Sequence, residues 1–128
     1  MNIDWSQLIT KAMKEAAAAA ARLTEAQALL KSRNEAAAAQ IARIQDRIDT
    51  LGYGIDSGEA TTEDEAEQQV LLGNVKQWKA YKFSLGKVSA QSSWPAAIEW
   101  PVQPAVPLIA ADPGIPVDSL KLADRPQP

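Results

Sequence analysis

The 128-residue chain contains neither cysteine nor histidine. Without cysteine it has no disulfide and no thiolate nucleophile, a usage that is typical of proteins in a reducing cytoplasm. Without histidine it lacks the commonest general base and metal ligand, so neither a Ser-His-Asp nor a Cys-His set can form. The sequence also has no phosphate-binding loop and no dinucleotide fingerprint. We therefore expect a protein that is not an enzyme and that binds no cofactor and no metal.

Aromatic residues make up only 5% of the chain, and alanine dominates its apolar fraction. This composition does not suit a large globular core and favours thin contacts between helices. No apolar run is long enough to span a bilayer, and the N-terminus lacks the pattern of a signal peptide, so we expect no membrane association. The net charge is −3, and the lysines at 76, 79 and 82 are too few for nucleic-acid binding.

Charge is unevenly distributed in the middle of the chain. Residues 51–69 carry six acidic side chains and no basic one, whereas residues 70–92 carry four lysines and no acid. Acids at the start of a helix and lysines toward its end are stabilised by the helix dipole, and the alternative is a patch that faces a partner. The acidic run at 63–65 lacks the alternating ligands and glycine of a calcium loop and fits a helix N-terminus.

Glycine and proline are both absent from Asp4 to Leu51, which predicts one long Ala-rich helix over residues 1–51, about 70 Å in length. Asp4 and Gln7 have the spacing of a capping box at its start. Steps of three and four residues connect a heptad seam typical of a coiled coil. Its members are Ile9, Met13, Ala16, Ala20, Leu23, Gln27, Leu30, Asn34, Ala37, Ile41, Ile44, Ile48 and Leu51. We interpret the polar members, Gln27 and Asn34, as residues that set the register.

Three glycines between residues 52 and 61 predict a turn, and a second amphipathic helix is expected over 62–88. Thr62 and Glu65 have capping-box spacing, and Gly86 is a plausible stop. The apolar positions of this helix are Ala66, Val70, Leu71, Val75, Trp78, Tyr81, Leu85 and Val88. The fold class is therefore all-α, an antiparallel coiled-coil hairpin of a long and a shorter helix.

The second helix, about 38 Å long, covers only half of the first. The N-terminal half keeps an apolar stripe with no partner in its own chain, and we expect it to bind a partner or a second copy. These candidate residues are Trp5, Leu8, Ile9, Met13 and Leu23. The alternatives are an intrachain staple for Trp5 and a merely solvated helix for the alanine face.

All eight prolines lie between Pro95 and Pro128, which excludes a regular helix or central strand there. Residues 89–117 are too apolar for an ordinary disordered tail and predict an extended Pro/Trp-rich strap, whereas 118–128 are expected to be disordered. A proline-stiffened strap loses less entropy on docking than a flexible one. The candidate partner-binding residues of the strap are Trp94, Ile98, Trp100, Pro101 and Pro104.

Residues 71–104 combine Trp78 and Tyr81, three apart on a helix, with Ile98-Glu99-Trp100-Pro101 and a closing Pro104. In these features the stretch resembles the C-terminal region of bacteriophage tail fibre assembly proteins. The resemblance implies a chaperone in the cytoplasm of the bacterial host, which binds a trimeric tail fibre near its receptor-binding end and assists folding and trimerisation. Related proteins accompany phage-tail-like bacteriocins, and many relatives carry a β-rich domain where this chain has its Ala-rich helix.

Two questions stay open at the level of sequence. Trp100 either folds back over Trp78 and Tyr81 or contacts the fibre directly. Because tryptophan and tyrosine are common anchors of interfaces, Trp78 and Tyr81 are also candidate partner-binding residues. The alternative function is a permanent coiled-coil adaptor of the tail particle, and a third is an immunity or regulatory protein.

Overall fold

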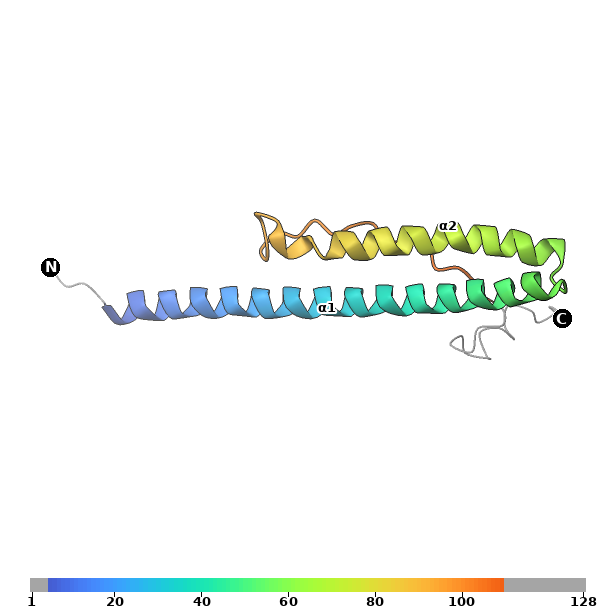
Figure 1. The fold of residues 1–128 in the computed structure, drawn as a ribbon. Helices are drawn as coiled ribbons and strands as arrows, with labels where there is room; N and C mark the ends of the chain where they lie inside the picture. The colour runs from blue at the N-terminus through green and yellow to red at the C-terminus, as the bar shows by residue number, and fades with distance from the viewer. Residues whose placement is uncertain (1–4, 110–128) are drawn as a thin grey trace, which may run out of the picture.

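The computed structural model describes residues 5–109, and over this range the chain is all-α, with no strand (Figure 1). Helix α1 spans Trp5–Ser57, helix α2 spans Thr62–Leu85, and a short 3-10 helix, η1, spans Val88–Ala90. Helix α2 runs antiparallel to the C-terminal half of α1, which confirms the all-α hairpin. The expected capping box at Asp4, the end of the expected strap (110–117) and the expected tail (118–128) lie outside the described residues.

Helix α1 continues through Gly52 and Gly54 to Ser57, so the prediction that it ends at residue 51 is wrong. The helix ends at Gly58, because only there does the backbone enter the left-handed region, with φ at 79°. The amides of residues 59 and 60 then donate to the Gly54 carbonyl at 2.9 and 3.0 Å, which closes the last turn. The turn between the helices therefore comprises residues 58–61, not 52–61.

The N-cap of α2 is Thr61, one residue before the predicted cap at Thr62. Its hydroxyl accepts from the Asp64 amide at 3.1 Å, and its own amide donates to the Asp64 carboxylate at 2.9 Å. Hydrogen bonding of the Asp64 carboxyl group to Thr61, first to its backbone amide and second to its side chain, lowers the pKa of Asp64 below its ordinary value. The run TTEDE contains two Thr-x-x-acid pairs, and the structure uses the first instead of Thr62 and Glu65. The helix ends at Leu85, and η1 follows where the prediction had continued α2 to residue 88.

A narrow core lies between the two helices. Its buried members are Ala37, Ile44, Ile48 and Leu51 of α1, Leu71, Val75, Trp78, Tyr81 and Leu85 of α2, with Val88 and Ile109. The α1 members belong to the predicted heptad seam, so the C-terminal half of that seam packs as expected.

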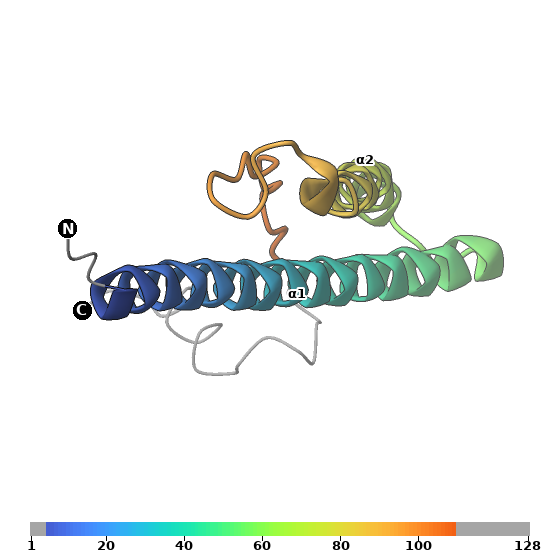
Figure 2. The same ribbon diagram turned by 90° about the vertical axis from the view of Figure 1, so that its left-hand side faces the viewer.

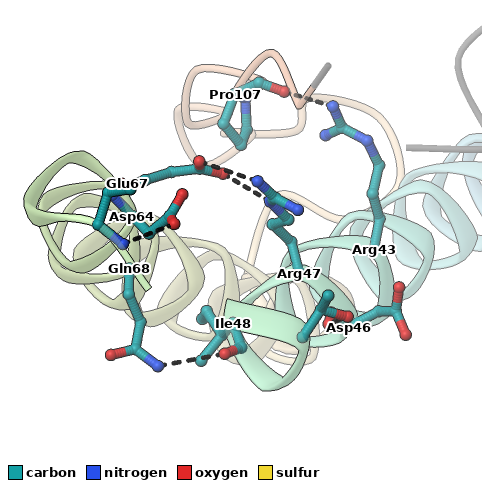
Figure 3. Close-up of polar contacts among 10 residues, drawn as sticks. Arg43, Asp46, Arg47, Ile48, Asp64, Glu67, Gln68 and Pro107 are labelled. Carbon is teal, nitrogen blue, oxygen red and sulfur yellow. Dashed lines mark hydrogen bonds and ion pairs between the residues drawn. The ribbon is translucent and has the colours of Figure 1, made fainter. Parts of the chain in front are cut away.

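Polar contacts reinforce the hairpin near its turn (Figure 3). The Arg47 guanidinium bonds both carboxylate oxygens of Glu67, at 2.7 and 3.1 Å, and this bond raises the pKa of Arg47. The Gln68 side-chain amide donates to the Ile48 carbonyl at 3.2 Å. These hydrogen bonds set the register of α2 along α1.

After η1 the chain turns through residues 91–99 and comes back as an irregular stretch, residues 100–109, which we name the return segment. It lies beside α2 and over α1, so the hairpin has a third, non-helical member (Figure 2). The turn is tied by Gln91, whose side-chain amide donates to the Glu99 carbonyl at 2.8 Å and whose side-chain oxygen accepts from the Glu99 amide at 3.0 Å.

Candidate interaction surfaces

The N-terminal part of α1 extends past the rest of the molecule (Figure 1). Every side chain from Trp5 to Glu25 is exposed, and we name this stretch the arm. The turn 91–99 reaches only to its base, where Pro95, Ala96 and Ile98 line a shallow groove with Ala26. The structure therefore leaves this half of the seam without a partner in its own chain.

The arm exposes large apolar side chains that the sequence analysis assigned to partner binding. Their exposed fractions are 64% for Trp5, 52% for Leu8, 57% for Ile9, 66% for Met13 and 38% for Leu23. An apolar surface of this kind on a soluble protein commonly marks an interaction site. The same heptad seam is thus buried at one end of the helix and uncovered at the other.

Of the two polar members of the seam, one contacts the second helix. Asn34 accepts a hydrogen bond from the Lys82 ammonium of α2 at 3.3 Å. Gln27 is exposed, near the base of the arm. Asn34 thus has a place in the hairpin, whereas Gln27 lies on the uncovered part of the seam.

Trp78 and Tyr81 are buried, so the structure offers neither of them to a partner. Their rings meet edge to face, with centroids 5.6 Å apart. The indole N–H of Trp78 donates to the Ala105 carbonyl at 3.1 Å, which fastens the return segment to α2. Their role in this structure is to hold the fold together, and their assignment to a partner-binding surface is not supported by their burial.

Trp100 packs onto the hairpin, at the start of the return segment. It is partly buried against the core, and the Arg33 guanidinium carbon of α1 lies 4.4 Å from its ring centroid. Trp94 and Ile98 are also partly buried against the same core. Trp100 therefore folds back onto the hairpin, with Arg33 of α1 against its ring, and a part of the Trp94, Ile98 and Trp100 side chains stays accessible.

The three prolines of the return segment face the hairpin at a regular spacing. Pro101, Pro104 and Pro107 are all half-buried, and three residues is the period of a polyproline II helix. The segment is held at its far end by the Arg43 guanidinium, which donates to the Pro107 carbonyl (Figure 3), and by the buried Ile109. Pro101 and Pro104 thus pack against the hairpin, and both also line an open groove with Val102 and with Gln77 of α2.

The outward side of the return segment is apolar, and the sequence analysis did not single it out. Val102 is 91% exposed, Val106 53% and Leu108 72%. Beside them on α2, Val70 is 63% exposed and lines, with Pro107 and Leu108, a groove of about 470 Å³. We name Val102, Val106, Leu108 and Val70 the apolar edge. The P-x-x-P-x-x-P spacing is the sequence signal that could have predicted this exposed surface. When the prolines face the hairpin, the side chains between them face away from it.

Within residues 5–109 no group of three or more acidic side chains is arranged to hold a metal ion. No helix in that range is long and apolar enough to cross a membrane. Comparisons with protein-family models, with curated proteins and with solved structures find no match.

Proposed function

We propose that the protein is a chaperone of a phage or phage-tail-like bacteriocin tail fibre, which acts in the cytoplasm of the bacterial host. The observation that carries the proposal is the apolar edge, a row of exposed aliphatic side chains on a segment fixed to a helical hairpin. Of its members, Val102 lies within residues 71–104, where the sequence resembles tail fibre assembly proteins, and Val70, Val106 and Leu108 lie just outside that stretch in the sequence.

The apolar edge suits transient binding of an apolar client surface. Three contacts from the two helices hold the return segment in place: the Trp78 hydrogen bond to the Ala105 carbonyl, the Arg43 hydrogen bond to the Pro107 carbonyl and the stacking of Arg33 on Trp100. Because the backbone is already ordered, binding through Val102 and its neighbours loses little conformational entropy. Covering the apolar ends of unassembled fibre chains would keep them from aggregating until they trimerise.

The test is co-expression of the protein with a fibre chain encoded beside it, followed by measurement of soluble trimer. Val102→Glu and Leu108→Glu place a charge in the apolar edge and are expected to lower the yield of trimer to the level without the protein. Gln103→Glu is the matched control, because Gln103 is exposed in the same segment and is already polar. A fibre that trimerises equally well without the protein contradicts the proposal.

The alternative is a permanent coiled-coil adaptor of the tail particle, and the long exposed arm is the observation that favours it. Mass spectrometry of purified particles separates the two functions. An adaptor is present in stoichiometric amount, whereas a chaperone is missing from the finished particle.

A further inference from the structure

The arm carries an apolar row that neither α2 nor the return segment covers. All members of the row are exposed, and they follow heptad spacing: Ile9, Met13, Ala16, Ala20 and Leu23, with the polar Gln27 as the next member just past the end of the arm. Helices of this length keep their structure mainly by packing an apolar face, although alanine helps. The row therefore calls for a helical partner, and its own order indicates which one.

We propose that the arm pairs with the arm of a second copy of this chain, antiparallel, about a two-fold axis at the level of residue 18. In that register Met13 faces the second copy's Leu23, and Ala16 faces the second copy's Ala20. Ile9 faces the second copy's Gln27 at each end. Large side chains thus meet across the interface on either side of a central alanine contact, where two helix backbones approach closely. Such a contact uses the same surface on both copies and closes on itself as a dimer.

The charge at the far ends of the hairpins favours the antiparallel direction. A parallel pair would bring together two hairpin ends that each carry eight acidic residues and one arginine over 46–67. In the antiparallel dimer these acidic ends lie at opposite extremes of the assembly, where their repulsion is screened.

The steric arrangement permits this pairing. The return segment contacts α1 through Arg33 and Arg43, and α2 contacts it through Ala37, Ile44 and Leu51. The proposed row lies N-terminal to these contacts. The turn 91–99 also lies beside α1, where Pro95, Ala96 and Ile98 line a groove with Arg22, Glu25, Ala26 and Leu29, and none of these four residues belongs to the row. The interface spans about 27 Å of helix, from residue 9 to residue 27. It uses a surface separate from the apolar edge, so it does not depend on the proposed chaperone function.

Disulfide trapping tests both the pairing and its direction, because the chain has no cysteine of its own. Met13→Cys and Leu23→Cys are made separately, one of them with an affinity tag, and the two proteins are mixed and oxidised. Both positions are exposed in the single copy, so the hairpin core is left intact. The antiparallel dimer gives mixed 13–23 disulfides in several-fold excess over 13–13 and 23–23 disulfides. A predominance of the symmetric disulfides overturns the proposal in favour of parallel pairing.

Ala18→Cys is the matched control, since residue 18 lies on the side of the arm opposite to the row. Trapping of the mixed pair that does not exceed trapping of Ala18→Cys overturns the proposal. Light scattering coupled to size-exclusion chromatography gives an independent readout on the unmodified chain. Twice the single-chain mass of 13.8 kDa supports the dimer, and the single-chain mass at every concentration tested overturns it.

Discussion

Two isoleucines of one helix provide the sharpest test of the fold. Ile9 and Ile44 lie on the same heptad row of α1, but Ile44 has no exposed surface and Ile9 is 57% exposed. Truncation of Ile44 to alanine removes three methylene-sized groups, worth about 2.4 kcal/mol in transfer free energy. The cavity left between α1 and α2 increases the loss of stability, and the better helix propensity of alanine offsets it by a few tenths of a kcal/mol. We expect Ile44→Ala to lower the free energy of unfolding by about 3 kcal/mol.

Ile9→Ala is the control and is expected to change the free energy of unfolding by less than about 0.5 kcal/mol in dilute protein. Urea unfolding followed by far-UV circular dichroism measures both variants, and the slope of the transition should stay unchanged. A cost below about 1 kcal/mol for Ile44→Ala refutes the packed seam. An equal cost for the two variants in dilute protein refutes the uncovered arm, because Ile9 would then have to be covered within a single copy.

Four further substitutions test individual residues of the hairpin. Tyr81→Phe should stabilise the protein by about 1 kcal/mol in urea unfolding, because the Tyr81 hydroxyl is buried without a hydrogen-bond partner among residues 5–109; a loss of stability contradicts this. Gly58→Ala should lower the free energy of unfolding by about 1–2 kcal/mol because φ is 79° there. Gly73→Ala, in open space on α2, should raise it by about 0.5–1 kcal/mol. Changes of the same sign in the two variants would contradict the backbone conformation assigned to these glycines. Asp64 has a lowered pKa in the folded state, so its contribution is present at neutral pH and is lost as pH falls through that pKa. The stability difference between the native chain and Asp64→Ala should therefore shrink between about pH 7 and pH 2, and a constant difference would argue against the capping box.

The hairpin could be predicted from the sequence because its signals are long and repeated. The stretch without glycine or proline fixed the existence of α1, and the seam from Ala37 to Leu51 identified the buried face. The ends of the helices could not be predicted from local composition. Gly52, Gly54 and Gly58 are the same type of residue, so local sequence does not distinguish them. The hydrogen bonds to the Gly54 carbonyl that close the last turn place the end of the helix at Gly58.

The surfaces were harder to predict than the fold. Trp78 and Tyr81 have the composition of interface anchors, yet both are buried, because the return segment comes back over the hairpin. Which side of that segment faces out depends on a contact between distant residues, such as the Trp78 bond to Ala105. The exposed arm could be predicted, since a helix of 24 residues cannot cover one of 53 residues.

The two proposals together constrain how a dimer could engage a fibre. The return segment lies level with residues 33–43 of α1, since Arg33 contacts Trp100 and Arg43 contacts Pro107. The proposed two-fold axis lies at the level of residue 18, about 20 residues or 30 Å along the helix from the middle of that range. The two apolar edges of a dimer would then lie roughly 60 Å apart along the helix axis. Simultaneous binding of both edges to one client requires two client surfaces at about that separation, because two linked sites gain affinity only when the geometry lets both engage.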